Sequence, residues 1–433
     1  MNRDRAVAGT VTGALVGGGV VVAVWPMLMA LATPVPPIGL IAHISGMLAG
    51  YLVLVLLVMM SRWPILDRGV GTDVLGRWHA VLGRTVLGLI LVHAFTAVAV
   101  WSQISGQDLG AALLDALGWN GVAAATVGTA MLVGVAVASA RVTRRKLSYE
   151  QWHLIHLTTY LAIALSFLHQ LAGPDLAGRP VLQVLWSLLY CGAFGLVLTY
   201  RVIAPIRGAF RQQMRVVALV PEAPGVVSLV VQGKYVEELR AEPGQFFRWR
   251  FLTPGLWHAA HPFSLSAPPT GNRMRLTVKA LGDGSRRVQQ VPVGTAVIAE
   301  GPYGALTQGR RTRPGVLLIA GGVGITPLRA LFESIDLAPG QDLMLLYRAD
   351  TAADIVFRAE LDSLAAERHA RVIYLLGDNP SLLSARSLTR LVPGLAVRDV
   401  YLCGPPGMTT AVRRSLMGAG VPERHVHEER FAL

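Results

Sequence analysis

The sequence predicts a membrane protein of three domains: a six-helix transmembrane bundle, then an antiparallel β-barrel, then an α/β domain with a parallel sheet. Two observations predict this order. The chain of 433 residues is 53% hydrophobic and only 15% charged, and its apolar runs are nearly continuous up to about residue 206. From Arg207 onward, charges and Pro/Gly turns separate short apolar segments, as in soluble proteins. We expect domains at residues 1–206, 207–309 and 310–433.

Six segments are long and apolar enough to cross a bilayer, which requires about 20 helical residues. The expected spans are residues 11–31, 39–60, 79–101, 121–140, 153–171 and 181–203. Because the first span follows Arg3 and Arg5, a signal peptide is the alternative for that segment.

The formal net charge of +13 is explained by the loops. Arg and Lys gather before the first span, between spans two and three, between spans four and five, and after span six, whereas the opposite connections contain almost none. This asymmetry predicts a plasma (inner) membrane protein whose amino terminus and whole carboxyl half are cytoplasmic. Basic residues so placed are topology signals and contacts for anionic cofactors. The lipid bilayer is therefore an expected partner and nucleic acid is not.

Four histidines lie inside two spans. His79 and His93 are 14 residues apart in the third span, and His156 and His169 are 13 apart in the fifth. Ionisable side chains at membrane depth are costly and are functional by default. The two spans run in the same direction, so we expect His79 to pair in depth with His156, and His93 with His169. Two imidazole pairs predict two haems whose axial positions are filled, which suits electron transfer; the alternative is interhelical hydrogen bonding.

The fifth span raises a geometric difficulty. At about 100° per residue the two histidines of the third span nearly share a helix face, but His156 and His169 lie about 140° apart. The span is therefore distorted, tilted, or approached by the haems from different sides. His153 is a spare candidate ligand, and His43 in the second span is expected to be a hydrogen-bonded packing residue. The two cysteines, Cys191 and Cys403, lie in different regions and support no iron–sulfur centre.

This histidine spacing resembles the ferric reductase and NADPH oxidase superfamily, and the resemblance continues through the soluble half. In that family the matching histidines are axial ligands of two b-type haems. The resemblance implies a transmembrane oxidoreductase that passes electrons from cytosolic NAD(P)H through FAD and two haems to oxygen or a ferric chelate on the outer face. The superoxide-forming oxidases have a further histidine one turn after the outer third-span ligand. Here that position is Ala97, which puts an oxidase-type oxygen site in doubt.

The soluble half divides at about Arg310. Before it, short alternating apolar runs at residues 226–231, 246–249, 274–278 and 296–299 predict a small antiparallel barrel. After it, apolar strand runs at residues 316–320, 343–347, 372–376 and 400–403 alternate with helical segments and predict a parallel α/β sheet.

The barrel carries three segments that resemble the family's FAD motifs. The first is His261-Pro262-Phe263-Ser264, in which the resemblance places His261 near the ribityl or phosphate region, Phe263 on the isoalloxazine and Ser264 near its reactive nitrogen. The second is residues 278–285, a Gly-rich turn whose backbone N–H groups would meet the pyrophosphate. The cofactor-binding candidates of the second and third segments are Val278, Lys279, Gly282, Gly284, Ser285, Gly301 and Gly304.

The last domain carries a Gly-rich turn that follows an apolar strand and opens a helix. In that context the backbone amides and the helix dipole meet a phosphate. The turn resembles the family's nicotinamide-dinucleotide loop. Its candidate residues are Gly321, Gly322, Gly324, Ile325, Thr326 and Pro327.

Three further positions complete the candidate site. Cys403, Gly404 and Pro405 resemble the family's segment near the nicotinamide, with a structural thiol as the alternative for Cys403. Arg348 follows a strand where an adenosine 2′-phosphate could be met, which favours NADPH over NADH; a surface arginine is the ordinary alternative. Phe431 resembles the family's carboxyl-terminal aromatic that shields the flavin, although two residues follow it here.

The candidate catalytic residues are thus Ser264, Cys403 and Phe431. Two other functions remain open. The chain could supply electrons to a separate membrane or extracytoplasmic redox partner, although no obligatory protein partner is evident in the sequence. It could also be a transporter or channel with a nucleotide-sensing domain.

Overall fold

The computed structural model describes residues 3–32, 35–144, 146–147 and 149–429. The chain divides into two compact units. Of the described residues, the helical unit comprises those within 3–66 and 74–202, and the sheet unit comprises 67–73 and 203–429. Phe431 lies outside the described residues.

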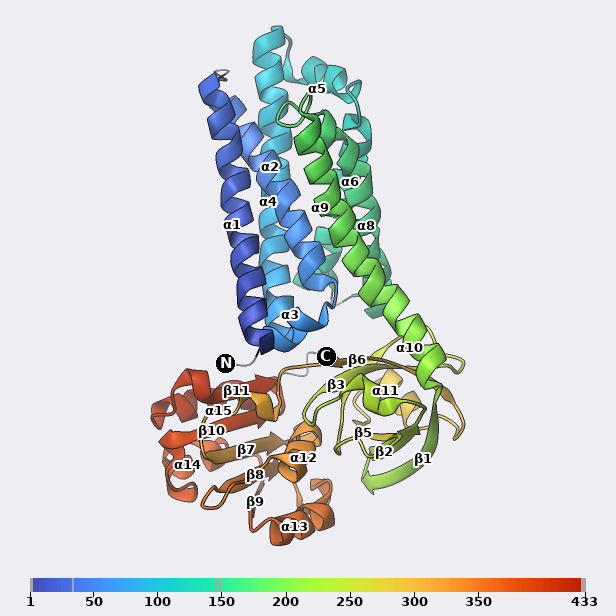
Figure 1. Cartoon of the computed structure of the whole chain (residues 1–433), viewed down its shortest axis with the longest axis vertical. Helices are drawn as coiled ribbons and strands as arrows, with labels where there is room; N and C mark the ends of the chain where they lie inside the picture. Colours follow the sequence, from blue (N-terminus) through green and yellow to red (C-terminus); the bar gives the residue numbers. More distant parts are fainter. Residues whose placement is uncertain (1–2, 33–34, 145, 148, 430–433) are drawn as a thin grey trace. The chain divides into compact units, whose positions relative to one another are not determined.

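The first part of the chain is helical (Figure 1). In chain order its helices are α1 Arg3–Ala32, α2 Pro37–Met60, α3 Pro64–Gly69, α4 Thr72–Ser105, α5 Leu109–Leu117, α6 Val122–Ser139, α7 Arg141–Arg144, α8 Tyr149–Ala172 and α9 Pro180–Leu198. A π-helical turn, η1 Thr199–Ile203, connects α9 to α10 Ala204–Gln212.

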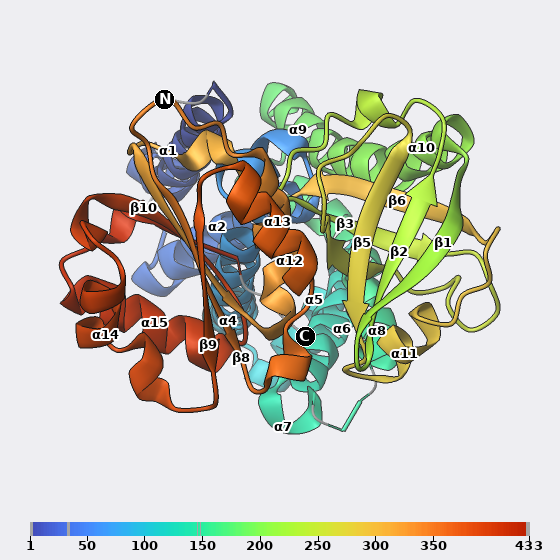
Figure 2. The same ribbon diagram turned by 90° about the horizontal axis from the view of Figure 1, so that it is seen from below.

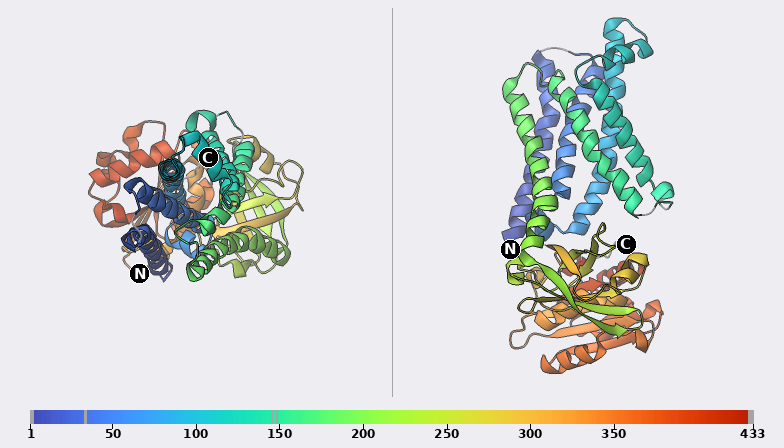
Figure 3. Two further views of the ribbon diagram at one scale, coloured as in Figure 1. Left: turned by 90° about the horizontal axis from the view of Figure 1, so that it is seen from above. Right: turned by 90° about the vertical axis from the view of Figure 1, so that its right-hand side faces the viewer.

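Six helices of the described residues are long and apolar enough to cross a membrane. These candidate spans lie side by side in one bundle (Figure 3). Their bounds are Gly9–Leu31, Pro37–Met60, Val74–Ser105, Val122–Ser139, Gln151–Ala172 and Pro180–Gln212. Large apolar side chains such as Leu154, Leu161 and Leu168 on α8 are exposed, which suits contact with lipid rather than water. The chain is a multi-pass membrane protein, as the sequence predicts.

Two details differ from the expected spans. The third span is longer than predicted, because α4 begins seven residues before His79. The connection between spans three and four, expected as a plain loop, contains α5, which Asp108 caps by accepting hydrogen bonds from the amides of Gly110 and Ala111. Close packing joins α6 to α8, where a Cβ at Gly128 would lie 2.7 Å from the carbonyl oxygen of Ala162.

The sheet unit begins with an antiparallel barrel. Its strands follow the order β4-β3-β6-β1-β2-β5, and an antiparallel bridge between Leu265 and Leu276 brings the two ends of that order together. Trp249, Phe247 and Phe251 are fully buried in its core. The elements are β1 Met214–Ala223, β2 Val226–Gln232, β3 Phe246–Phe251, β4 His261–Ser264, β5 Arg273–Lys279, α11 Asp283–Val288 and β6 Ala296–Tyr303.

A five-stranded parallel sheet follows, in the order β11-β10-β7-β8-β9. Its strands and helices are β7 Gly315–Gly321, α12 Ile325–Ser334, β8 Leu343–Ala349, α13 Arg358–Glu367, β9 Arg371–Leu376, α14 Ala385–Leu391, β10 Arg398–Cys403, α15 Pro406–Gly418 and β11 Val426–Glu429. Short 3₁₀ turns are η2 Val236–Leu239, η3 Gln308–Arg310, η4 Gly322–Gly324, η5 Ala352–Asp354, η6 Pro380–Leu383, η7 Leu395–Val397 and η8 Glu423–His425.

Helices cover both faces of this sheet, α12 and α13 on one side and α14 and α15 on the other (Figure 2). The chain leaves β7 for β8 on one side and returns through β10 on the other, so the strand order reverses between β7 and β10. Ligands of open α/β sheets bind at the carboxyl ends of the strands at such a switch point. We therefore expect a ligand site at the loops after β7 and β10.

Candidate functional site

The four span histidines meet in the expected pairs. The ring centroids of His79 and His156 are 5.9 Å apart, and those of His93 and His169 are 6.3 Å apart. With metal–imidazole bonds of about 2 Å, two rings on opposite sides of one metal have centroids about 6 Å apart. Both pairs therefore have a separation that one iron between the rings would require.

Hydrogen bonds orient the second pair. The Nδ1 of His93 donates to the carbonyl oxygen of Ala42 at 2.8 Å, and the Nδ1 of His169 donates to that of Ser166 at 2.6 Å. These bonds leave Nε2 of each ring as the nitrogen available to a metal, the usual arrangement for a ligating histidine.

In the first pair, the Nδ1 atoms of His79 and His156 are buried and have no hydrogen-bond partner within the part of the chain that the structure describes. Trp152 stacks on the ring of His156 with centroids 5.2 Å apart. A buried polar nitrogen without a partner is costly, so this pair also fits a bound group.

The helix that carries His156 and His169 is not interrupted. Residues 149–172 form one α-helix. A helix break therefore does not explain how the angle of about 140° between the two rings is accommodated. Tilt of α8, or approach of the haems from different sides, remains.

A cavity of about 1040 Å³ lies in the helical unit, lined by His93, His169 and mostly apolar residues of α2, α4, α5, α6, α8 and α9. This volume is at the upper end of the roughly 300–1,000 Å³ of small-molecule sites. The second histidine pair thus faces a space suited to a large, mostly apolar cofactor.

Two glycines that the sequence analysis did not single out lie against the second histidine pair, and one of them, Gly46, lines the cavity. A Cβ at Gly46 would lie 2.6 Å from Nδ1 of His93, and one at Gly121 would lie 2.7 Å from the amide nitrogen of His169. Glycines on the apolar face of a membrane helix are a known signal of close approach. A single sequence does not say which of the many glycines face a ligand.

The first flavin motif forms β4, which pairs antiparallel with β3. Ser264 is 2% exposed, and its hydroxyl has no hydrogen-bond partner among the described residues. The rings of His261 and Phe263 stack at 6.2 Å, and Pro262 between them is exposed. A buried hydroxyl without a partner fits a ligand that supplies one, as a flavin nitrogen would.

The second motif lies beside the first. A Cβ at Gly284 would lie 3.0 Å from Cε1 of His261. The hydroxyl of Ser285 accepts from the amides of Leu281 and Gly282, both at 2.9 Å, so it caps its own turn. Val278 is fully buried in the barrel core, and Lys279 is half-buried at the end of β5. Val278 can therefore meet a cofactor only through its backbone.

The third motif, at the end of β6, lies against the end of β11. Gly301 and Gly304 both have positive φ, 153° and 91°. A Cβ at Gly304 would lie 2.9 Å from a carboxylate oxygen of Glu429, at the end of β11. The end of β11 thus lies beside the third flavin motif.

The two loops at the switch point pack directly on one another. A Cβ at Gly324 would clash with the carbonyl of Cys403 and lie 2.7 Å from the amide nitrogen of Gly404. Pro405 would contact a Cβ at Gly321 at 3.1 Å. The two loops can come this close because glycine has no Cβ. Both predicted nucleotide segments therefore lie together at the carboxyl ends of β7 and β10.

The helix after the Gly-rich turn begins at Ile325, and η4 contains Gly322. Ile325, Thr326 and Pro327 are buried, and the Thr326 hydroxyl donates to the carbonyl of Val323 at 3.0 Å. These side chains hold the turn, and its amides at the amino end of α12 are the groups left to meet a phosphate.

Arg348 on β8 lies beside the start of the Gly-rich turn, because it pairs with Gly321 at the end of β7. Its Nε donates to the carbonyl oxygen of Gly377 at 3.0 Å, and its Nη2 is 3.7 Å from Asp350.

Cys403 is fully buried, and burial raises the pKa of its thiol well above the usual value. The sulfur therefore stays a thiol, which suits packing better than nucleophilic chemistry.

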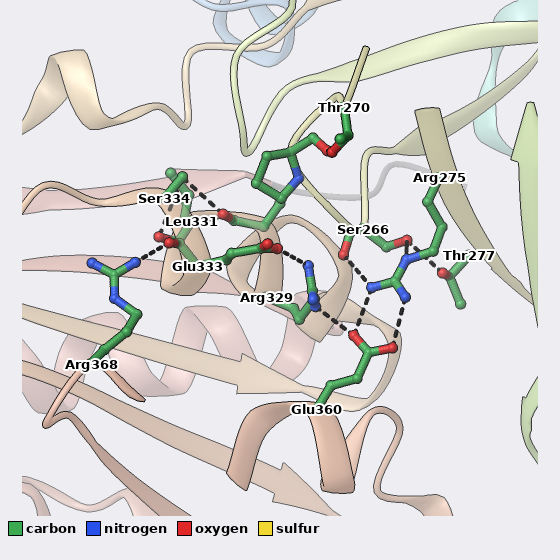
Figure 4. Close-up of polar contacts among 12 residues, drawn as sticks. Ser266, Thr270, Arg275, Thr277, Arg329, Leu331, Glu333, Ser334, Glu360 and Arg368 are labelled. Carbon is green, nitrogen blue, oxygen red and sulfur yellow. Dashed lines mark hydrogen bonds and ion pairs between the residues drawn. The ribbon is translucent and has the colours of Figure 1, made fainter. Parts of the chain in front are cut away.

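An ion-pair network joins the barrel to the parallel-sheet domain (Figure 4). Arg275 on β5 binds both carboxylate oxygens of Glu360 on α13, at 2.7 and 2.9 Å, and Arg329 on α12 binds Glu360 at 2.8 Å. Burial raises the pKa of Glu360, but the two guanidinium groups outweigh it and hold that pKa below its usual value. The network thus connects the barrel, which carries the flavin motifs, to the domain that carries the nucleotide loops.

Comparison with known families identifies the helical unit. Residues 45–167 match the family "Ferric reductase like transmembrane component", a stretch that contains three of the four paired histidines, His79, His93 and His156, and ends two residues before His169. Residues 318–414 match the family "Oxidoreductase NAD-binding domain". The chain joins a ferric reductase-like transmembrane domain to an NAD-binding oxidoreductase domain.

Relatives of this ferric reductase-like chain match its sheet unit. The ferredoxin reductase component of a 3-ketosteroid-9-alpha-monooxygenase from Mycolicibacterium smegmatis is 31% identical over 229 residues, which cover 51% of this chain and 64% of that protein. Ferredoxin–NADP reductase B from Sorangium cellulosum is 30% identical over 237 residues, covering 51% and 97%. The FAD/NAD-binding domain of a nitric oxide dioxygenase from Vibrio cholerae aligns with 25% identity and a TM-score of 0.43, covering 51% and 98%. The ferric reductase-like chain is thus a membrane oxidoreductase with an FAD- and NAD(P)H-type reductase module.

Proposed function

We propose that the protein carries electrons from cytosolic NAD(P)H across the plasma membrane to an acceptor on the outer face. The single observation that supports this most is the meeting of α4 and α8 through two histidine pairs at different depths. His79 with His156 would hold an inner b-type haem, and His93 with His169 an outer one. Because both axial positions are filled, these haems would supply electron transfer rather than ligand binding at iron.

The orientation follows from the charges. Arg and Lys gather at the ends of the spans that lead to the sheet unit and at the amino terminus. Cytoplasmic loops carry such an excess, so we place the amino terminus and the sheet unit in the cytoplasm.

In the sheet unit, the loops after β7 and β10 would hold the dinucleotide, with Arg348 at the adenosine end. Ser264, His261 and Phe263 would hold the flavin, and Phe431 would cover it. A bound FAD accepts a hydride as two electrons and releases them singly. The chain's own contribution is to position these groups and to exclude water. The hydroxyl of Ser264 and the Gly324–Gly404 contact serve that positioning.

The test is the visible spectrum of the full chain, purified in detergent with FAD and reduced anaerobically with NADPH. We expect two haem equivalents that are reduced by NADPH. Absence of haem would overturn the proposal and favour a transporter or channel. Fast reoxidation in air with stoichiometric superoxide indicates an oxidase, reaction with ferric chelates indicates a ferric reductase, and slow reaction with both indicates a separate redox partner.

Variants separate the ligands from their neighbours. His79→Ala and His93→Ala should each remove one of the two haem equivalents. His153→Ala is the matched control, because it removes an imidazole from α8 that belongs to neither pair, and it should keep both equivalents. Loss of haem in His153→Ala with retention in His79→Ala would contradict the assignment.

A further inference from the structure

The cavity beside His93 and His169 extends well beyond the two rings. On α2 it is lined from Gly39 to Val53, which spans about 21 Å of helix at 1.5 Å per residue. Gly46, against which His93 lies, is at the middle of that stretch. The half toward the amino-terminal end of α2, the outer end in the proposed topology, forms an outer pocket. It is lined by His43, Trp101, Leu109, Leu113, Trp119 and Asp175.

One wall of the outer pocket is aromatic. Trp101 and Trp119 meet edge to face with ring centroids 4.8 Å apart. The indole nitrogen of Trp101 donates to Asp115 at 2.7 Å, which fixes the orientation of that ring. Leu109 and Leu113 of α5 add apolar surface. Aromatic walls of this kind favour a planar, apolar ligand, which they contact by stacking or edge-to-face packing.

The outer pocket also contains an acid–base pair. The Nδ1 of His43 donates to both carboxylate oxygens of Asp175, each at 2.9 Å. The side chains are 23% and 13% exposed. A carboxylate in this position fixes the tautomer of the imidazole and stabilises its protonated form, leaving Nε2 to give a proton to a ligand. The pair is therefore built to act as a general acid.

The charges of the lining disfavour an anionic acceptor. Asp175 is the sole carboxylate among the described residues that line the cavity, and none of them is Lys or Arg. An anionic ferric chelate would meet a carboxylate and no cation there. Molecular oxygen requires neither an aromatic wall nor a pocket of this size.

We propose that the outer pocket binds a quinone and that His43, oriented by Asp175, protonates its carbonyl oxygens. This inference rests on the proposed function, because NAD(P)H must supply the electrons through the groups held by the histidine pairs. Two electrons and two protons convert the quinone to the quinol, so that each C=O becomes C–OH. NAD(P)H is oxidised to NAD(P)+ and supplies the two electrons, which would reach the outer pocket one at a time. Both protons come from water through His43, which is reprotonated between the two transfers.

The experiment compares two acceptors. The full chain loaded with FAD and haem is supplied anaerobically with NADPH and either a short-chain benzoquinone or ferricyanide, which takes one electron and no proton. In His43→Gln and Asp175→Asn, the ratio of the quinone rate to the ferricyanide rate should fall at least tenfold, as expected when a general acid is lost. Asp108→Asn is the matched control: it changes an outer carboxylate that caps α5 and does not line the cavity, and the ratio should stay within twofold.

Binding is measured separately, without turnover. The same benzoquinone is titrated into the oxidised full chain and followed by quenching of tryptophan fluorescence. We expect saturable binding that Trp119→Ala weakens several-fold. Absence of saturable binding, or an unchanged rate ratio in His43→Gln, would overturn the quinone site. Ferricyanide reduction in that case would leave the proposed function intact, whereas haem that NADPH fails to reduce would overturn the proposed function itself.

Discussion

Gly46 in α2 lies directly against the imidazole of His93 in α4, so close that a Cβ there would come within 2.6 Å of Nδ1 and 2.7 Å of Cε1. The ring is held from the same side by the carbonyl of Ala42, one turn earlier in α2. The position of one candidate haem ligand is therefore decided by a backbone stretch in a different helix.

Gly46→Ala should displace the His93 ring, because the added methyl group has no room beside it. We expect loss of at least half of one haem equivalent, measured by the haem-to-protein ratio of the purified chain. Gly88→Ala in α4 is the matched control, since nothing lies within 4 Å of its Cβ position. Full haem content in Gly46→Ala would show that the His93 ring can move without consequence.

Gly324→Ala should disrupt the contact between the two nucleotide loops. The new Cβ would clash with backbone atoms of Cys403 and Gly404, which cannot rotate away. Overpacking of this kind costs about 1–3 kcal/mol, and we expect NADPH binding to weaken at least tenfold. Isothermal titration with NADPH measures this. Gly407→Ala, where the Cβ site is open, should bind like the unchanged protein; equal weakening in both variants would refute the explanation.

Ser264→Ala should slow flavin reduction without destabilising the protein. Its hydroxyl has no hydrogen-bond partner among the described residues, so its removal costs the fold nothing, while a lost flavin contact is worth about 0.5–1.5 kcal/mol, or two- to tenfold in rate. Stopped-flow reduction by NADPH measures the rate.

Ser266→Ala gives the contrasting result. Its hydroxyl accepts from Thr277 at 2.7 Å and from Arg275 at 3.2 Å in the region of Figure 4. We expect the free energy of unfolding, measured by thermal denaturation, to fall by about 1–3 kcal/mol, and the rate of flavin reduction to stay unchanged. If Ser264→Ala lowers stability as much as Ser266→Ala does, the Ser264 hydroxyl has a structural role.

Arg348→Ala should change the choice of nucleotide. The guanidinium is anchored on the carbonyl of Gly377, and a hydrogen bond to a charged phosphate is worth about 1.5–3 kcal/mol. We expect kcat/KM for NADPH to fall about 10- to 100-fold and kcat/KM for NADH to change less than threefold. An equal fall for both nucleotides would mean that Arg348 holds the loop rather than the 2′-phosphate.

Asp399→Asn should destabilise the sheet unit in a pH-dependent way. Burial raises the pKa of Asp399, but hydrogen bonds from His427, the amides of Thr312 and Arg313, and His425 outweigh it and hold the pKa well below its usual range. A lowered folded-state pKa stabilises above the unfolded value of about 3.9, and this stabilisation is lost as pH falls through the folded-state pKa.

We therefore expect Asp399→Asn to cost about 2–3 kcal/mol at pH 7 and progressively less below about pH 4. Thermal unfolding of the full chain, followed by FAD release, measures this. Asp399 lies at the amino end of β10, whereas the nucleotide loops follow its carboxyl end, so NADPH affinity at pH 7 should be unchanged. A constant difference from pH 7 down to about pH 2 would show that the carboxylate charge is not the cause.

The sequence by itself determined the elements whose signal is local. The six spans are visible because lipid requires about 20 apolar residues in a row, and the strand runs of the parallel sheet are visible because buried strands are apolar throughout. The pairing in depth of His79 with His156 also followed from the helix rise and from the shared direction of the third and fifth spans. Strands β1, β4 and β11 were not predicted; β4 and β11 have only four residues each and are held by their neighbours in the sheet.

Only the tertiary structure decided which backbones and side chains come into contact. His43 and Asp175 are 132 residues apart, and Gly324 meets Gly404 from another strand. Neither contact has a sequence signal, because it depends on how whole helices and strands pack. The clearance at Gly46 and the hydrogen-bonding state of the Ser264 hydroxyl likewise appear only when the surrounding elements are in place. For that reason the sequence indicated the chemistry of the sites, and the packing decided their shape.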